Sequence, residues 1–424
     1  MIRVDSRPFA AAVAFAVLAA CASPSTREAR IDPRIAGEIA KIKAIDNHAH
    51  PVRPTAQGEK PDDEYDALPV ETLEAQSDPV RSRPGAPELL EAHRQLFRGD
   101  KAKAARTYGQ DYAVRVLDQL GIETMLANRV AVGPGLPPPR FLWVPFADAL
   151  MYPLPTDVLV HNSDQKVFFA DEDRLLKRYY SESGVTSRPA TLDEYLNKVV
   201  RATLERHKQA GAVAEKFEMA YLRPLDIDNP ARADAEKVYV SGKGDYKALQ
   251  DYIFRFIATE CGRLALAVHL HAAAGGGGYF NVSGANPMLL EPLLNDPALR
   301  KTNFVLIHGG WPFTREVTAL LTKPNAYVDF SEQTTTNYAR DVSQGIRAWL
   351  EYVPEKVLFA TDAYSFSPEM GWEEAGYIAT TTGRDALGMA LTGMLRDNEI
   401  TRDRALELAR MVLRDNARKL YGLK

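Results

Sequence analysis

The sequence predicts an α/β protein, specifically a (β/α)8 TIM barrel, and three observations carry this prediction. Short apolar runs rich in β-forming residues alternate with segments that have the apolar periodicity of helices. There are eight such runs, which is the number of strands that closes this barrel. The rival fold, an open doubly wound sheet, lacks its phosphate-binding signature, because no run is followed by Gly-x-Gly-x-x-Gly. The glycine run at 275–278 does not have that spacing and is expected to be a loop.

The predicted strands and helices alternate along the whole chain. The strands are expected over 44–46, 123–130, 140–148, 213–222, 264–271, 304–307, 326–330 and 357–361. The helices are expected over 112–120, 191–209, 246–261, 287–294, 314–321 and 342–352, with two more inside 386–420. Such alternation favours a parallel sheet that is covered by helices.

Two segments are longer than a bare barrel requires. The segment 52–110, rich in Pro, Asp and Glu, follows the first strand, and 152–188 follows the third. Loops in these positions lie at the carboxyl ends of the strands, where barrel enzymes have their active sites. We therefore predict that both form a lid over the site, with ordinary surface decoration as the alternative.

The first residues resemble the export signal of a bacterial lipoprotein. Arg3 and Arg7 precede an apolar run, 9–20, which is too short to span a bilayer and ends in Leu18-Ala19-Ala20-Cys21. This resemblance to a lipobox implies cleavage before Cys21 and attachment of lipid to it. An ordinary cleavage site that happens to contain a cysteine is the alternative.

The predicted organisation follows from this signal. Residues 1–20 form the signal peptide, 21–40 a tether that ends in a short helix, and 41–424 the barrel. Position 22 is alanine, not the aspartate that favours retention in the inner membrane, so the resemblance implies a lipid anchor in the outer membrane, facing the periplasm.

The composition is that of a globular protein, with 46% hydrophobic residues, 25% charged residues and a net charge of −4. No basic face is evident, so a nucleic-acid partner is not expected. Cys261 has no disulfide partner once Cys21 is modified, and we expect it to be a small buried residue. A chain of this length can bury a large core without disulfides. The oligomeric state stays open, a homo-oligomer included.

Potential metal ligands gather at the ends of the predicted strands. Five of the eight histidines and one aspartate occupy such positions: His48, His50, His269, His271, His308 and Asp362. Residues at i and i+2 of a strand share a face, and all strand ends of a barrel meet at one mouth. A single histidine there is more often a hydrogen-bonded core residue, but four strands ending this way indicate a site for a divalent metal, zinc above all, with one or two ions.

These residues resemble the ligand pattern of the amidohydrolase superfamily, which has His-x-His on strand one, lysine on strand four, histidines on strands five and six, and aspartate on strand eight. More closely, the chain resembles the amidohydrolase-related branch (amidohydrolase 2) that includes the N-terminal domain of fungal FluG proteins. The resembling segments are 46–50, 216–225, 285–290, 308–315, 361–363 and 416–422. The resemblance covers residues 41–424, and the lid segments match poorly.

The resemblance implies a role for each ligand. His48 and His50 bind a first metal together with Asp362, which also accepts a proton from the activated water. His269 and His308 bind a second metal, or, in single-metal branches, one of them binds and the other polarises the substrate carbonyl. His271 shares a face with His269 and stays an alternative ligand.

Lys216 lies inside the fourth predicted strand, where an ammonium group is costly to bury without compensation. Near two cations its pKa would fall, and the neutral amine could capture carbon dioxide as a carbamate. Resemblance to two-metal members implies that this carboxylated lysine bridges both ions. The alternative is an ion pair, for which Glu218 shares the face of Lys216 whereas Glu215 points away.

The reaction implied is metal-dependent hydrolysis of an amide (C–N) or related acyl bond in a small molecule. Tyr221, Arg223 and Trp311, just beyond strand ends, are weak candidates for substrate binding, together with His271. A non-hydrolytic decarboxylase of aromatic acids is the first alternative. A surface lipoprotein that binds metal or a ligand without turnover is the second, although an intact Asp362 argues against it.

Overall fold

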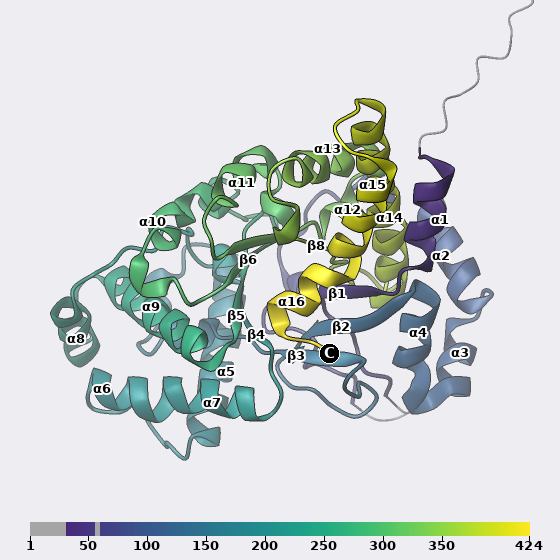
Figure 1. Cartoon of the computed structure of the whole chain (residues 1–424). Helices are drawn as coiled ribbons and strands as arrows, with labels where there is room; N and C mark the ends of the chain where they lie inside the picture. Colours follow the sequence, from purple (N-terminus) through teal and green to yellow (C-terminus); the bar gives the residue numbers. More distant parts are fainter. Residues whose placement is uncertain (1–30, 56–59) are drawn as a thin grey trace, which may run out of the picture. The chain divides into compact units, whose positions relative to one another are not determined.

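A set of eight parallel strands forms the centre of the computed structural model, which describes residues 31–55 and 60–424 (Figure 1). The first three strands make one sheet: β1 (Ala44–Ala49), β2 (Ile122–Asn128) and β3 (Phe141–Val144). The other five make a second sheet: β4 (Ala214–Phe217), β5 (Ala267–His271), β6 (Phe304–Ile307), β7 (Ala326–Asp329) and β8 (Val357–Leu358).

Backbone hydrogen bonds join the two sheets at both of their edges. Between β3 and β4, the N–H of Lys216 donates to the carbonyl of Pro145 at 2.7 Å. Between β1 and the segment that continues β8, the N–H of Asn47 donates to Phe359 at 2.9 Å, and that of Asp362 donates to His48 at 2.8 Å. Hydrogen bonds therefore run round all eight strands in chain order, as the predicted (β/α)8 barrel requires.

Helices follow the strands and surround them (Figure 1). Those of the first half are α1 (Pro33–Lys41), α2 (Pro87–Phe97), α3 (Lys101–Tyr108), α4 (Tyr112–Leu120), α5 (Ser163–Glu182), α6 (Leu192–Tyr195), α7 (Ala202–Gln209) and α8 (Arg232–Ser241). Those of the second half are α9 (Tyr246–Leu264), α10 (Glu291–Leu294), α11 (Thr314–Leu320), α12 (Gln333–Thr336), α13 (Ala339–Leu350), α14 (Trp372–Arg396), α15 (Arg402–Arg410) and α16 (Asn416–Tyr421).

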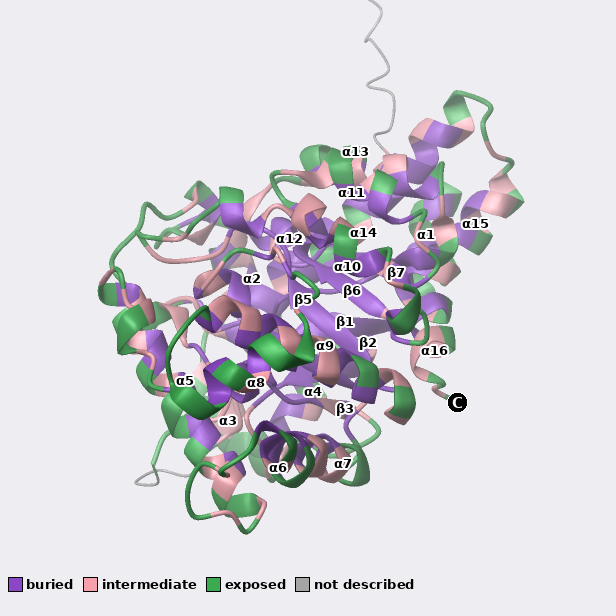
Figure 2. Cartoon of the chain, turned by 90° about the vertical axis from the view of Figure 1, so that its left-hand side faces the viewer, coloured by how far each residue is buried: buried purple, intermediate pink, exposed green. Residues whose placement is uncertain are grey.

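Helix α4 shows how the sequence specifies these elements. Ala113, Val116, Leu117 and Leu120 recur at helical spacing, and all four are buried. The helix ends at Gly121, whose φ of 68° is the left-handed conformation that glycine adopts without strain. Prediction and structure agree here on 112–120. The same division into a buried and an exposed face is visible on most outer helices, whereas most strand residues are buried (Figure 2).

Apolar side chains fill the barrel beneath its mouth. Seven of the eight strands contribute buried residues to this cluster: Ile45, Leu126, Val144, Ala214, Ala267, Val305, Ile307 and Leu358. The interior is therefore a packed core, which leaves the mouth as the place where polar side chains meet. Cys261, predicted to be a small buried residue, is fully buried in the larger cluster between strands and helices.

The first predicted lid segment contacts the mouth, and the second contacts the first. In the first, the backbone carbonyl of Tyr65 lies 3.2 Å from His50 Nδ1. In the second, Asp164 of α5 accepts a hydrogen bond from the backbone of Glu74 at 2.8 Å, so the segments also contact each other. Helices α2, α3 and α5 lie within them and were not predicted.

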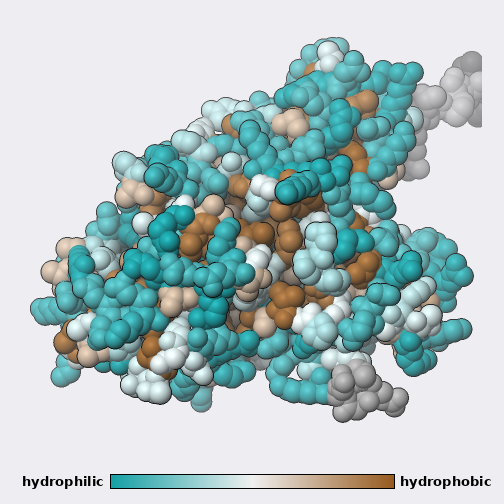
Figure 3. All heavy atoms as spheres, turned by 60° about the horizontal axis from the view of Figure 1, so that its bottom comes forward, coloured by the Kyte–Doolittle hydropathy of each residue, from teal (hydrophilic) through white to brown (hydrophobic). Residues whose placement is uncertain are grey.

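The predicted signal peptide and Cys21 lie outside the described residues. Over 31–55 and 60–424, no helix is both long and apolar enough to cross a membrane. On one face of the molecule, hydrophilic residues occupy most of the periphery, and hydrophobic residues show through in the middle (Figure 3).

Candidate metal centre

Three ligand atoms from the first strand and from the segment after the last strand meet at the mouth of the barrel. Nε2 of His48 lies 3.1 Å from Asp362 Oδ1, Nε2 of His50 lies 3.6 Å from the same oxygen, and the two Nε2 atoms are 3.4 Å apart. Ligands about 2.1 Å from a tetrahedral zinc ion lie about 3.4 Å from one another, by simple geometry. The triangle therefore has the size of one face of a metal's coordination shell.

The two histidines of β1 are held by their second nitrogens. His50 Nδ1 donates to the carbonyl of Tyr65 at 3.2 Å, which leaves the lone pair on Nε2. Asn128 Nδ2 donates to His48 Nδ1 at 2.7 Å, so Nε2 of His48 carries the proton that faces Asp362. A cation can bind there only if this proton leaves, which makes binding pH-dependent.

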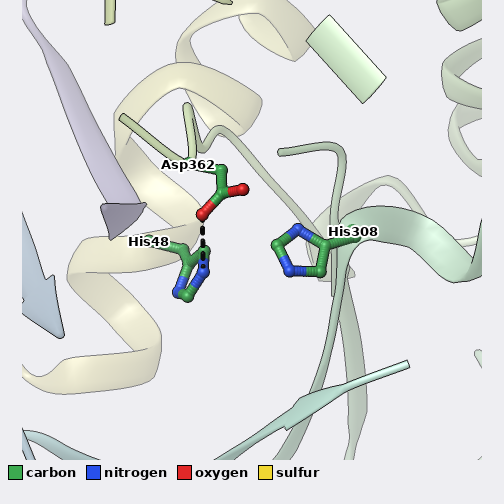
Figure 4. A group of neighbouring side chains, drawn as sticks. All are labelled: His48, His308 and Asp362. Carbon is green, nitrogen blue, oxygen red and sulfur yellow. Dashed lines mark ion pairs between the residues drawn. The ribbon is translucent and has the colours of Figure 1, made fainter. Parts of the chain in front are cut away.

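His308 faces the triangle from the end of β6, opposite His48 and Asp362 (Figure 4). Its Nδ1 donates to Ser331 Oγ at 2.8 Å, and that hydroxyl donates to Asp329 Oδ1 at 2.6 Å. Because Nδ1 holds the proton, Nε2 is an acceptor. This tautomer suits a metal ligand and cannot donate a hydrogen bond to a substrate carbonyl.

Three groups of side chains within the described residues could hold a metal ion, each with its ligand atoms within 4.8 Å of one another. These groups are His48, His308 and Asp362; His271, His308 and Glu332; and His50, Asp66 and Glu218. His308 belongs to two of them. Its ring centroid lies 5.0 Å from that of His48 and 4.6 Å from that of His271.

Burial keeps the imidazoles neutral. It lowers the pKa of His48, His50, His271 and His308 well below the ordinary value, and the charge of Lys216 lowers each further. Neutral rings can give a lone pair to a cation. Burial also raises the pKa of Asp362 to about 7, against the opposing effect of Lys216.

Lys216 lies among these groups as an ion pair. Its Nζ is 3.2 Å from Glu218 Oε1, and its side chain is 1% exposed. Glu215 points away and lies 3.1 Å from His207. The ion pair that we considered as the alternative to carboxylation is therefore present, with the partner that strand alternation indicated. Carboxylation of Lys216 stays a prediction.

His269, the strand-five histidine that we favoured as a ligand, lies outside the three groups, and His271 lies within one. His269 Nε2 donates to the hydroxyl of Tyr421 at 2.7 Å, and that hydroxyl donates to Asn47. Its Nδ1 is buried without a hydrogen-bond partner among the described residues. Both histidines face the interior. However, only His271 pairs with Ile307, the residue before His308, in the register of β5 against β6.

The weak candidates for substrate binding have different positions. The ring of Tyr221 lies 4.8 Å from that of His271, so it borders the site. Arg223 forms an ion pair with Asp251 at 2.7 Å, and its part in substrate binding stays a prediction. Trp311 is 37% exposed, beside the mouth.

Sequence reasoning missed Glu332, Asp66 and Asn128. Glu332 follows the seventh strand as Asp362 follows the eighth, and this position was a usable signal. Asp66 and Asn128 carry no such signal, because a lid segment and a buried strand residue reach the site only through the fold.

The comparisons with known proteins agree with the geometry. A family model described as amidohydrolase matches residues 45–423. The chain belongs to the amidohydrolase family. Protein fluG of Emericella nidulans is 31% identical over 201 residues, which are 46% of this chain and only 22% of that protein.

Solved structures share the fold of this amidohydrolase. A protein from Lactobacillus casei, described as a metal-dependent hydrolase, has a TM-score of 0.60 at 16% identity, covering 92% of this chain and 97% of that one. A uronate isomerase from Bacillus halodurans has a TM-score of 0.58 at 11% identity, covering 92% and 96%. At such identities the likeness concerns the fold alone.

The residues present fit a divalent cation, which members of this family bind. The triangle has the dimensions of a coordination shell, its imidazoles are neutral, and a carboxylate oxygen completes it. Glu218 Oε2 is in addition buried without a hydrogen-bond partner among the described residues.

Proposed function

We propose that this amidohydrolase is a metal-dependent hydrolase that cleaves an amide (C–N) or related acyl bond of a small molecule. The observation that supports this best is the triangle of His48, His50 and Asp362. A bound divalent ion, which we propose to be zinc, supplies a water with a pKa of about 7 and polarises a carbonyl group.

Asp362 is the proposed proton carrier. Both imidazole contacts involve its Oδ1, so Oδ2 is available to accept a proton from water and pass it to the leaving nitrogen. His48, His50 and His308 hold the centre in place, because each has one nitrogen tied to the surrounding structure.

The substrate is proposed to be a small molecule. A cavity of about 810 Å³ adjoins the loops that follow β1 and β8, and Val52 and Ser365 are among its lining residues. Its volume is in the range of ligand pockets. We propose that substrates approach from this side, past residues that follow His50 and Asp362.

The test is a panel of N-acyl amino acids and dipeptides, assayed with and without a chelator. We expect hydrolysis that the chelator abolishes and added zinc restores. Release of carbon dioxide from aromatic acids would replace the proposal by decarboxylation. Zinc binding without turnover of any compound would favour a non-catalytic binding protein.

We further propose that the mature protein begins at a lipidated Cys21 and is anchored at the outer membrane, facing the periplasm. The support is Leu18-Ala19-Ala20-Cys21 after a basic start and a short apolar run. Cys21→Ala should move the protein from the membrane fraction to the soluble fraction. A mature protein that starts at another, unmodified residue contradicts the anchor.

A further inference from the structure

Four buried carboxylates lie beside the candidate metal centre, and we infer that they bind a protonated amine of the substrate. The residues are Asp66, Asp148, Glu172 and Glu218, and each is between 1% and 6% exposed. The inference rests on the hydrolase proposed above and gives its substrate a chemical class. That class is an amide with a primary amine only a few atoms from the carbonyl group that is cleaved.

Different parts of the fold bring these four residues together. Asp148 follows β3 and Glu218 follows β4, and both oxygens of Asp148 accept the backbone N–H of Glu218 at 2.9 Å. Asp66 belongs to the first lid segment, and an oxygen of its carboxylate lies within 4.8 Å of one of Glu218. Glu172 belongs to α5 in the second lid segment, and α5 packs against the turn that begins at Asp148. Two strand ends and both lid segments therefore form this acidic cluster.

Glu172 is the residue that points to a ligand. It lies in the buried stripe of α5, where the other positions are mostly apolar. Neither of its carboxylate oxygens has a hydrogen-bond partner among the described residues. Burial and the negative charges of Asp148, Glu218 and Asp66 raise the pKa of Glu172 well above its ordinary value. A buried carboxyl group in this position is costly unless a ligand supplies the missing hydrogen-bond donors.

Two further polar atoms of this region also lack a partner among the described residues. Oε1 of Glu218 lies 3.2 Å from Lys216 Nζ, but its Oε2 is buried without a hydrogen bond. The hydroxyl of Tyr152 is buried in the same way, and burial together with the charges of Asp148 and Glu172 raises its pKa. The acidic cluster therefore has more acceptors than the surrounding protein satisfies.

The charge of the acidic cluster favours a positively charged ligand. Burial raises the pKa of Asp66, Asp148 and Glu218, and the positive charge of Lys216 opposes this rise. Every charge of the described residues that shifts the pKa of Glu172 is negative. A cationic nitrogen among these groups would stabilise their ionised forms, and such attraction is stronger in a buried site than in water.

The spacing of the acidic cluster favours an ammonium group over a further metal ion. Of its four residues, only Asp66 and Glu218 belong to a group with ligand atoms within 4.8 Å of one another. The third member of that group is His50, whose Nδ1 already donates its proton to the carbonyl of Tyr65. An ammonium group needs no such compact shell, because its three N–H donors point in different directions.

The acidic cluster is separated from the metal centre by one imidazole ring. On one side of this ring, His50 Nε2 lies 3.6 Å from Asp362 Oδ1, and on the other side, Nδ1 lies 3.6 Å from Asp66 Oδ2. An amine held by the cluster and a carbonyl group held at the metal can therefore belong to one small molecule. The distance between them permits only a short spacer.

The experiment compares pairs of nitroanilides that differ in the amine. The anilides of glycine, β-alanine and γ-aminobutyric acid are matched with those of acetic, propionic and butyric acid, and kcat/KM is measured on the zinc-loaded full chain. In at least one pair, the amine should raise kcat/KM by about tenfold or more, the usual effect of hydrogen bonds to a charged group. Glu172→Gln should remove most of this ratio, because the amide keeps the shape and loses the charge. Glu172→Asp, which keeps the charge, should retain part of it.

Asp173→Asn is the matched control. Asp173 is the next residue of α5, but its side chain is 53% exposed and forms an ion pair with Lys177. The ratio within each pair of anilides should therefore equal that of the wild type.

A second readout needs no turnover. Thermal melting of the metal-free full chain is measured with butylamine or with butanol at equal concentration and ionic strength. Butylamine should raise the melting temperature of the wild type and of Asp173→Asn more than butanol does, because it binds the folded acidic cluster. In Glu172→Gln the difference between the two compounds should shrink.

The other outcomes also decide. If Glu172→Gln loses activity equally on both members of every pair, Glu172 has a structural role and the inference is overturned. If Glu172→Gln does not fold, the wild-type ratio and that of Glu172→Asp decide in its place. Chelator-sensitive hydrolysis with no preference for the amine would refute only this inference. Stabilisation by butylamine that depends on Glu172, without turnover of any compound, would refute only the proposed hydrolase.

Discussion

Each imidazole of the candidate centre has one nitrogen fixed by a hydrogen bond to the surrounding structure. The partners are the amide of Asn128 for His48, the carbonyl of Tyr65 for His50, the carbonyl of Ala273 for His271 and the hydroxyl of Ser331 for His308. Such partners fix ring orientation and strengthen the ligand. The site is thus largely formed before an ion arrives.

His48→Ala and His50→Ala should each lose bound zinc, because each removes an atom of the triangle. Asp362→Asn should keep the fold but lower kcat by about 10²- to 10⁴-fold, the usual size of a proton-transfer contribution. Elemental analysis, kcat and thermal melting measure these effects. His161→Ala, at an exposed histidine, is the control. Full zinc content and activity in both triangle variants would exclude this site.

Lys216→Met should lower the free energy of unfolding by about 3–5 kcal/mol, because it leaves the buried carboxylate of Glu218 without its cation. Urea unfolding measures the loss. The double variant with Glu218→Gln should recover much of it, since the unpaired charge is then absent. If the single and double variants are equally unstable, Lys216 does not stabilise the fold through its ion pair with Glu218. A carbamate signal after growth in labelled bicarbonate would instead confirm carboxylation.

Motif spacing was sufficient to find His48, His50, His308 and Asp362. Residues at strand ends meet at the barrel mouth, and this holds even if the exact bounds of the strands are not known. Motif spacing could not choose between His269 and His271. Both face inward on one strand, and only the register of β5 against β6 shows which is level with His308. No apolar pattern in the sequence predicts the backbone conformation that places Glu332 at the mouth.

Among the elements, the ends of β6 and β7 act as one unit through Asp329. Its Oδ1 accepts from the N–H groups of His308 and Ser331, at 3.0 Å and 3.1 Å, and its Oδ2 accepts from Asn47 at 2.8 Å. A carboxylate with no free proton is needed, because every one of these partners donates. Asp329 therefore positions His308 without touching a ligand atom.

Asp329→Asn should weaken zinc binding by about 10- to 100-fold, the usual cost of losing a group that orients a ligand. The new amide would direct a donor at groups that already donate. Competition titration with a chromophoric chelator measures the change. Asp341→Asn, at an exposed position on α13, should bind zinc as the wild type does. Unchanged affinity in Asp329→Asn would show that β6 holds His308 without help.

All eight predicted strands and the helix 112–120 are confirmed, because their apolar patterns are regular. The fourth strand was predicted too long, since Met219–Tyr221 forms a 3-10 turn after β4. Helices α5 and α8 were missed because charged residues interrupt their apolar stripes and only a few positions are buried. Where polar residues dominate a helix, tertiary packing decides its formation.

For the molecule as a whole, the stability of the metal-free protein should fall as pH rises from about 7 to about 8. Burial raises the pKa of Asp46 and Asp362 to about 7 and that of Asp148 to about 8, against 3.8 when unfolded. In this window the unfolded state has already lost these protons while the folded state still holds part of them, so stability falls by up to about 1.4 kcal/mol per pH unit for each group. Unfolded histidines are already largely neutral there.

Urea unfolding with a chelator present, repeated across that range, measures the slope. Saturating zinc should flatten or reverse it, because a cation favours the ionised carboxylate of Asp362. Metal-free stability that rises over the same range would contradict the burial of these carboxyl groups in their protonated form.

The closing bonds between β1 and the segment after β8 determine when in the life of the chain an ion can be bound. His48 and Asp362 are more than three hundred positions apart, yet they are neighbours across this seam. A nascent chain has no complete triangle until Asp362 has been synthesised and the last strand has reached the first. Contacts between such distant segments are late to form. Metal loading therefore belongs to the end of folding, and a chain cut short anywhere before Asp362 has no complete triangle.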